Sequence, residues 1–300
     1  MAISKILSTA EATTVEHAQV TDVADQSIGT IIAETRNLTA EQVEKVLAHQ
    51  KAKGIRFGEA AVALGYASND DVLFALSQQF HYPYAAEGQR KANPELVALN
   101  QPFSVQAESF RAIRSQIIMR LFNEGQERHA IAVVSPDSGD GKTYFAANLA
   151  VTLAQLGGRT LLVDADLRGP RQHEVFGIDN SAGLSGILSG RAESKVIQQV
   201  AGVPSLFVLP VGITPPNPLE LVERPAFGLL IRELLGKFDH VVVDTPAAQY
   251  GSDCAVIAAR CGAALVIARQ GKSAVVSLQD LVANLVETPA KLAGVIVNEF

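Results

Sequence analysis

The chain has 300 residues, of which 48% are hydrophobic and 19% are charged, a balance typical of a globular protein with one large and one smaller domain. Its net charge of −6 gives no electrostatic sign of nucleic-acid binding, so we expect no nucleic-acid partner. No stretch approaches the roughly 18 apolar residues that cross a bilayer. Met1–Gln26 lacks the apolar segment of a signal peptide. We therefore expect a cytoplasmic protein, and any membrane role would go through a partner.

The N-terminal third contains an internal repeat. Residues 1–26 are polar and weakly periodic, which indicates a mobile tail. Two 24-residue units follow, separated by five residues. In each unit a helical apolar pattern comes directly after a residue suited to an N-cap, Thr39 in the first and Ser68 in the second. The repeat predicts a small helical tandem-repeat module over 27–86, in which the two units bury their apolar faces together.

The rest of the chain alternates between two patterns. Residues 87–102 contain two prolines and little periodicity, which predicts a linker. Phe103–Asn123 has a helical pattern, and short runs rich in Val, Ile and Leu then alternate with further helices, as in a parallel sheet covered on both faces. Residues 103–300 are therefore expected to form a doubly wound, mainly parallel α/β domain. Its predicted strands are Ala130–Val134, Thr160–Val163, Leu206–Leu209, His240–Val243, Ala264–Ala268 and Leu292–Val297.

The loop after the first of these strands, residues 135–143, reads Ser-Pro-Asp-Ser-Gly-Asp-Gly-Lys-Thr. Its Gly-Lys-Thr end, between a strand and a helix, matches a phosphate-binding loop (P-loop), although Pro136 replaces the usual first glycine. The backbone N–H groups of such a loop and the helix N-terminus attract anionic oxygens. Lys142 would contact the β and γ phosphates, and the Thr143 hydroxyl would bind Mg²⁺. The predicted ATP contacts are Ser138, Gly139, Asp140, Gly141, Lys142, Thr143 and Tyr144.

Three carboxylates follow later strands. Asp164 and Asp166 come after the second strand, and Asp244 ends another hydrophobic run. The carboxyl ends of parallel strands form the edge at which open α/β sheets bind ligands. A single strand-end aspartate is a common turn residue, but three of them together with a Gly-Lys-Thr loop predict a site for a nucleotide and Mg²⁺.

Three segments carry a resemblance to a known family. Residues 164–170, Asp-Ala-Asp-Leu-Arg-Gly-Pro, and 241–246, Val-Val-Val-Asp-Thr-Pro, resemble motifs of the bacterial tyrosine kinases of exopolysaccharide systems. These kinases belong to the MinD-like P-loop ATPases, and among them the chain resembles the EpsG-like chain-length-determinant kinases. Residues 108–114 match the oligomerisation motif of that family, Glu-x-x-Arg-x-x-Arg. The resemblance covers 103–300.

The resemblance implies an ATP- and Mg²⁺-dependent protein tyrosine kinase that regulates polysaccharide chain length or export. It implies two partners. One is a membrane polysaccharide co-polymerase, which the chain would bind at its cytoplasmic tail. The other is further copies of the chain, in a homo-oligomer stabilised by Glu108, Arg111 and Arg114. Two other functions remain open at this point. One is a nucleotide-switched ATPase scaffold without significant kinase activity, and the other is a MinD-like positioning ATPase.

Residue roles also follow from the resemblance. The catalytic residues would be Lys142, Asp164, Asp166 and Asp244. The Mg²⁺ ion would be held by Thr143, Asp166 and Asp244, either directly or through water. Asp164 is the first candidate for the base that accepts the tyrosine proton, but the choice between Asp164 and Asp166 stays open.

The helical repeat carries a second resemblance, to the N-terminal domain of type II secretion ATPases, which binds cyclic di-GMP in some members. The resemblance implies a cyclic di-GMP site as regulator, with Arg56 and Gly58 in the second unit and Gly29 and Arg36 in the first. The first unit departs from the pattern, because Ser27 stands where arginine is expected. A module that docks another protein is the alternative.

The sequence has five tyrosines that could accept phosphate. Tyr82 and Tyr84 flank a proline, which favours an extended backbone, so we predict that one of them is autophosphorylated at low stoichiometry while a partner is the main substrate. Tyr66 is expected to pack within the repeat, and Tyr144 to lie too close to its own site. Tyr250 follows the strand that ends at Asp244, where it is either buried or on a loop.

Overall fold

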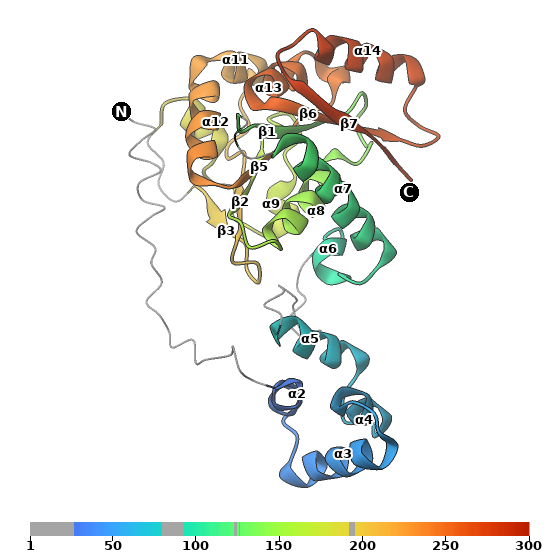
Figure 1. Cartoon of the computed structure of the whole chain (residues 1–300). Helices are drawn as coiled ribbons and strands as arrows, with labels where there is room; N and C mark the ends of the chain where they lie inside the picture. The colour runs from blue at the N-terminus through green and yellow to red at the C-terminus, as the bar shows by residue number, and fades with distance from the viewer. Residues whose placement is uncertain (1–26, 80–92, 123–124, 126, 192–195, 300) are drawn as a thin grey trace. The chain divides into compact units, whose positions relative to one another are not determined.

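The computed structural model describes residues 27–79, 93–122, 125, 127–191 and 196–299, which fall into two compact units (Figure 1). The helical module contains the described residues 27–79, and the α/β unit contains those from 93 onward. The predicted tail, 1–26, lies outside the described residues, as do Tyr82 and Tyr84. None of the described helices is long and apolar enough to cross a membrane.

The helices of the module begin at the predicted caps. The module consists of α2 (Ile28–Thr35), α3 (Ala40–Lys53), α4 (Phe57–Ala63) and α5 (Asn69–Gln79). Thr39 and Gln42 form a capping box, in which each side chain accepts a hydrogen bond from the backbone N–H of the other. Ser68 and Asp71 exchange the same pair of bonds at the start of α5. Both predicted N-caps are therefore confirmed, because each satisfies N–H groups that a helix start leaves without partners.

The module has little hydrophobic core. Its buried apolar residues form two small clusters, one of Ile31, Ile32 and Ala75 and the other of Val46, Ala60 and Ala61. Helices α4 and α5 approach each other closely at Gly58, where a Cβ atom would lie 2.8 Å from Cγ1 of Val72. Glycine is therefore required at this position by packing.

The α/β unit is built on one sheet. Its described strands are β1 (Ala130–Val134), β2 (Thr160–Asp164), β3 (Gln198–Gln199), β4 (Leu206–Leu209), β5 (His240–Asp244), β6 (Gly262–Arg269) and β7 (Lys291–Asn298). The order across the sheet is β3-β4-β2-β5-β1-β6-β7. All neighbours are parallel except β3 and β4. Parallel neighbours place their carboxyl ends at one edge of the sheet, which is the edge that holds the phosphate-binding loop.

Successive residues of the central strands face two different cores. Ala130, Ala132 and Val134 belong to one buried cluster, and Ile131 and Val133 to the other. The first cluster is closed by α10 (Leu184–Leu188), α11 (Pro218–Glu223), α12 (Pro225–Lys237), α13 (Asp253–Cys261) and α14 (Val275–Val286). The second is closed by α6 (Val97–Asn100), α7 (Val105–Leu121), α8 (Lys142–Ala154) and α9 (Gln172–Phe176) (Figure 1).

This architecture confirms the predicted doubly wound, mainly parallel fold. The predicted strands are all present with the same bounds or one to three residues longer. The two-residue antiparallel strand β3 was not predicted, since Gln198 and Gln199 carry no apolar pattern.

The predicted linker is wrong over its described part, 93–102. Leu96 and Ala98 are buried, and the segment contains α6. Asn148, which is buried on α8, joins this segment to the domain: its Oδ1 accepts the N–H of Ala98 at 2.9 Å and its Nδ2 donates to the carbonyl of Glu95 at 2.8 Å. These bonds satisfy buried backbone groups, so the segment is part of the α/β unit.

Candidate nucleotide and metal site

The phosphate-binding loop joins β1 to α8. Gly139 and Gly141 have φ angles of 81° and 95°, which residues with a Cβ rarely adopt. Lys142 opens α8 and is only 6% exposed. Its Nζ donates to the Ser135 hydroxyl at 3.0 Å, so the ammonium group is held inside the loop. The loop thus combines a buried cation with backbone suited to converging N–H groups.

A cavity of about 810 Å³ opens beside this loop. It is lined by the turn after β2, by α7 and by the end of β7, in addition to the loop itself. Of the predicted ATP contacts, the ones that line it are Ser138, Gly139, Gly141, Lys142, Thr143 and Tyr144. Asp140 does not: its buried side chain accepts the N–H of Asp137 at 3.0 Å and so supports the loop from within.

Asp164 and Asp244 are paired in register on neighbouring strands and are both buried. Burial raises the pKa of Asp164 well above its usual value, and the neighbouring Asp244 raises it further. Burial also raises the pKa of Asp244 to about 6, although Lys142 opposes this change. Two buried carboxylates side by side disfavour ionisation of both, so the pair favours uptake of a proton.

The donor set fits Mg²⁺. Asp244 Oδ1 is buried without a hydrogen-bond partner, while its Oδ2 accepts a hydrogen bond from Gln172 Nε2 at 2.9 Å. Mg²⁺ takes oxygen ligands, and it is usually held by one or two carboxylates together with phosphates. Within the described part of the chain, no group of three or more His, Cys, Asp or Glu is arranged to hold a metal ion by itself. Asp244 and Thr143 would hold the ion together with the nucleotide.

Asp164 and Asp166 occupy different environments. Both carboxylate oxygens of Asp164 accept backbone N–H groups, from Asp166 at 3.2 Å and from Gln172 at 3.0 Å, and the residue does not line the cavity. Asp166 does line the cavity. Its Oδ1 accepts the N–H groups of Arg168 at 3.1 Å and Gly169 at 2.9 Å, which fixes the carboxylate in a tight turn.

Sequence reasoning missed two side chains at this site. Gln172 Nε2 donates to the Thr143 carbonyl at 3.1 Å and to Asp244 Oδ2 at 2.9 Å, so it links the loop to the carboxylates. Lys272 Nζ donates to the Ser138 carbonyl at 2.7 Å from the segment after β6. Neither residue belongs to a motif, and only the fold brings them to the loop.

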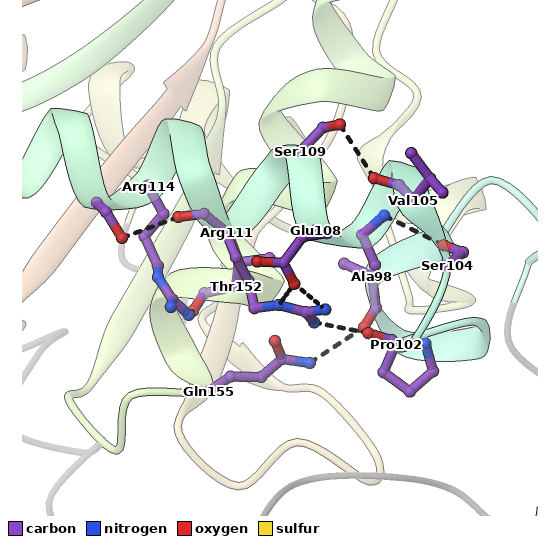
Figure 2. A network of polar contacts seen from close by, with 12 residues as sticks. Ala98, Pro102, Ser104, Val105, Glu108, Ser109, Arg111, Arg114, Thr152 and Gln155 are labelled. Carbon is purple, nitrogen blue, oxygen red and sulfur yellow. Dashed lines mark hydrogen bonds and ion pairs between the residues drawn. The ribbon is translucent and has the colours of Figure 1, made fainter.

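The predicted oligomerisation residues lie on α7 and are bonded within the chain (Figure 2). Glu108 forms an ion pair with Arg111 at 2.6 Å, and Arg111 also donates to the Pro102 carbonyl. Arg114 donates to the carbonyl of Thr152 on α8 at 2.8 Å. The Glu108 side chain is nevertheless 69% exposed, so this face of α7 is open to solvent.

Three of the four residues of the cyclic di-GMP prediction have packing or ion-pair roles in the helical module. A Cβ at Gly29 would lie 3.4 Å from the ring of Phe57, and Gly58 allows the close approach described above. Arg36 forms an ion pair with Asp71 at 2.7 Å. Arg56 precedes α4 and is exposed. Binding of the nucleotide stays a prediction.

Comparison with known proteins extends these observations. Residues 131–300 match the family described as the CobQ/CobB/MinD/ParA nucleotide binding domain. CapB of Staphylococcus aureus is 34% identical over 203 residues, which cover 67% of this chain and 87% of CapB. The solved kinase domain of the Escherichia coli tyrosine kinase ETK is 31% identical with a TM-score of 0.65, and the match covers 70% of this chain and 81% of that domain.

The chain belongs to the bacterial tyrosine-protein kinases. The predicted family and the predicted P-loop fold are therefore confirmed. Relatives in this kinase family differ in length. The match to the tyrosine-protein kinase Ptk of Acinetobacter johnsonii, at 32% identity, covers 70% of this chain but only 28% of Ptk.

Proposed function

We propose that this kinase transfers the γ-phosphoryl group of ATP to tyrosine hydroxyls in a Mg²⁺-dependent reaction. The observation that carries the proposal is the cavity in which Lys142, Thr143 and Asp166 meet at the carboxyl edge of the sheet. Phosphoryl transfer needs little from a protein beyond positioning and charge stabilisation, and these three groups supply both.

Each residue has a distinct role in the proposed reaction. Lys142 and the loop N–H groups bind the β and γ phosphates, and Thr143 and Asp244 hold Mg²⁺. Bound Mg²⁺ would neutralise charge that develops between the β and γ phosphates. Gln172 keeps Asp244 oriented by its hydrogen bond of 2.9 Å, as the outer partners of metal ligands do.

Asp166 is the better candidate for the base. It lines the cavity, whereas the oxygens of Asp164 are taken up by backbone N–H groups. A phenol has a pKa of about 10, so a carboxylate cannot remove its proton before attack. Asp166 would instead accept the proton as the loose transition state forms, and Asp164 would support the buried metal site.

Kinase activity is tested by incubating the purified chain with Mg²⁺, ATP and a tyrosine-containing copolymer and then detecting phosphotyrosine by immunoblot. The proposal predicts a signal that requires ATP and is lost in Lys142→Met. ATP turnover without phosphotyrosine on the chain or the copolymer would support the ATPase scaffold instead.

We further propose that α7 mediates assembly into a homo-oligomer. The helix begins beside exposed apolar groups, with Val105 84% and Phe103 57% exposed, next to the exposed Glu108. Charge reversal at Arg111 and Arg114 should reduce the mass measured by light scattering with ATP present. Arg120→Glu is a matched control, because Arg120 lies on the same helix and also donates to a main-chain carbonyl, that of Ala293. An unchanged mass in the motif variant, starting from an oligomeric wild type, would refute the role.

The resemblance to kinases of exopolysaccharide systems supports a role in polysaccharide chain length or export. In this proposal the kinase acts in the cytoplasm at the tail of a membrane co-polymerase. Co-purification with that tail peptide, with and without ATP, tests the partnership. Loss of binding in both conditions would contradict it.

For the helical module, cyclic di-GMP binding and protein docking remain the two proposals. Calorimetric titration with cyclic di-GMP separates them, with Arg56→Ala as the variant, because a guanidinium can pair with phosphate or stack on guanine. Heat that disappears in the variant would support nucleotide binding. If titration of the wild type with cyclic di-GMP gives no heat of binding, protein docking is the proposal that remains.

A further inference from the structure

Three successive carbonyls of the phosphate-binding loop accept hydrogen bonds from side chains at the ends of β6 and β7. These bonds run from Lys272 Nζ to Ser138 at 2.7 Å, from Arg269 NH1 to Gly139 at 3.3 Å and from Asn298 Nδ2 to Asp140 at 3.3 Å. The Lys272 ammonium lies directly on the loop, since a Cβ atom at Gly139 would be 2.6 Å from its Nζ. The donors come from a part of the sequence far from the loop, and the fold brings them to it.

The carbonyls at the start of the loop are bonded as well. Those of Ser135 and Pro136 accept the N–H groups of Ala248 at 2.9 Å and Gln249 at 3.0 Å, which follow β5. The carbonyl of Asp137 accepts the Ser135 hydroxyl at 2.7 Å. Every carbonyl from residue 135 to residue 140 therefore has a donor within the protein.

The bonds to the carbonyls set the direction of the N–H groups between them. In a trans peptide the C=O and the N–H point in opposite directions. Holding the carbonyls of residues 138–140 toward β6 and β7 therefore turns the N–H groups of Gly139, Asp140 and Gly141 the other way. Among the described residues, none accepts a hydrogen bond from these three N–H groups, and both glycines line the cavity. Successive N–H groups of this kind form a concavity that binds anions.

The position of Lys272 is itself fixed by a tight turn after β6. The Ser273 hydroxyl accepts the N–H of Arg269 at 2.8 Å. The Arg269 carbonyl accepts the N–H groups of Lys272 at 3.2 Å and Ser273 at 3.0 Å. Asn298 is paired with Arg269 in the register of β6 and β7. The three donors are thus held in place by the sheet and its turn before a nucleotide binds.

Charge adds to this arrangement. The loop itself contains two acidic residues, Asp137 and Asp140, whose charges oppose the binding of a triphosphate. Lys272 and Arg269 place two positive charges against the same loop, in addition to the buried Lys142.

We propose that Lys272 is a positioning residue for the nucleotide: together with Arg269 and Asn298 it holds the phosphate-binding loop in the conformation that receives the β and γ phosphates. The inference rests on the proposed function and deepens it by assigning the ends of β6 and β7 to the support of its nucleotide site. Contacts of the loop N–H groups with the β phosphate are the same before and during phosphoryl transfer. Lys272 should therefore affect nucleotide binding more than the chemical step.

The experiment measures the affinity of the whole chain for ATP and for inorganic tripolyphosphate by calorimetric titration with Mg²⁺. Lys272→Met should weaken both by the same factor of about tenfold, the effect of one hydrogen bond to a charged group. Lys272→Arg keeps a cationic donor and should retain most of the affinity. Unchanged affinities in Lys272→Met, or an equal loss in Lys272→Arg, would overturn the proposal.

Lys291→Met is the matched control. It removes the same charge from the exposed start of β7, at the opposite end of this strand from Asn298, and should leave both affinities unchanged. An equal loss in Lys291→Met would overturn the proposal, because net charge would then explain the effect of Lys272.

Salt separates a short hydrogen bond from a general attraction between charges. At about 1 M salt the Debye length is about 3 Å, so long-range attraction is screened. The ratio of wild-type to Lys272→Met affinity should be the same at about 0.1 M and about 1 M salt. A ratio that falls to one at the higher concentration would overturn the positioning role.

Steady-state kinetics separate this inference from the kinase function. In Lys272→Met the KM for ATP should rise about tenfold while kcat stays within about twofold of the wild type. Phosphotyrosine formed by this variant with the wild-type KM would overturn the inference and leave the kinase function intact. ATP turnover without phosphotyrosine, together with the expected loss of affinity, would contradict the kinase function and support the inference.

Discussion

The two units of this chain are stabilised in different ways. In the α/β unit every residue of β1 is fully buried, and alternate residues enter two large cores on opposite faces of the sheet. The helical module has two clusters of three buried residues, and capping boxes and an ion pair supplement them. Small modules bury too little surface for a wide margin of stability. We therefore expect substitutions in the α/β site to change chemistry while the fold persists, and single substitutions in the module to change its stability.

The largest expected effect is in the phosphate-binding loop. Lys142→Met removes the buried cation, and charge-assisted hydrogen bonds of this kind are worth about 1.5–3 kcal/mol each. We expect ATP binding to weaken by about 100-fold or more while the melting temperature changes little. Calorimetric titration with ATP and thermal unfolding measure the two quantities. Unchanged ATP affinity would contradict the assignment of the loop.

The next largest effect is at the carboxylate pair. Asp244→Asn removes a metal-site charge, which should lower Mg²⁺-dependent ATP turnover by about 10–100-fold. Full turnover at low Mg²⁺ would show that Asp244 is only a strand-end residue.

Asp244 also gives the free protein a pH dependence with a defined sign. Its folded pKa of about 6 lies above the ordinary value of about 3.9. Protonated Asp244 therefore makes its full contribution to the free energy of unfolding below about pH 4. This contribution is lost as the pH rises through about 6. Asp244→Asn should raise the melting temperature of the nucleotide-free chain at pH 7 more than at pH 5, as calorimetry can measure. An equal effect at both values would contradict the raised pKa.

In the helical module, Gly58→Ala should destabilise and Gly29→Ala should not. The new Cβ would lie 2.8 Å from Cγ1 of Val72 at residue 58 but 3.4 Å from the Phe57 ring at residue 29. Overpacking of this kind costs about 1–3 kcal/mol. Hydrogen exchange should show faster opening of α4 and α5 in Gly58→Ala with ATP affinity unchanged. Equal exchange in the two variants would show that the contact at Gly58 carries no packing role.

The smallest expected effect is at the Asp71 cap. Burial opposes ionisation of this carboxyl, but the hydrogen bonds from Ser68 and the contact with Arg36 outweigh it and hold its pKa below the usual value. Its contribution to stability is therefore present above about pH 4 and is lost as the pH falls below that value.

Replacing Asp71 by Asn should cost about 1 kcal/mol at pH 7, typical of a helix cap. Chemical unfolding of wild type and variant at pH 7 and pH 3.5 would show a difference that shrinks at the lower pH. A difference that grows would contradict the lowered pKa.

Much of the fold and of the candidate site could be predicted from the sequence, because strands and the phosphate-binding loop have local sequence patterns. The apolar runs predict the central strands, and the Gly-Lys-Thr loop and strand-end aspartates predict that Lys142, Thr143 and Asp166 meet. The segment 93–102 was predicted to be a linker because it contains prolines and little periodicity. In the structure four of its residues are buried, and its backbone is hydrogen-bonded to Asn148 on α8, a contact that the local sequence does not indicate.

The direction of side chains was the second feature that could not be predicted from the sequence. The motif includes Asp140 among the predicted ATP contacts but does not give the direction of its side chain, which accepts the N–H of Asp137. Gln172 carries no motif and reaches Asp244 only because α9 begins beside the sheet edge. Spacing in a sequence does not report either feature.

The central claim is that the site of the α/β unit transfers phosphoryl groups to tyrosine, and not only to water. The most direct measurement follows ADP release and phosphotyrosine formation in the same reaction of wild-type chain, Mg²⁺-ATP and a tyrosine copolymer. The account predicts that phosphotyrosine appears together with ADP, and that Lys142→Met loses both. ADP release by the wild type with no phosphotyrosine would contradict it.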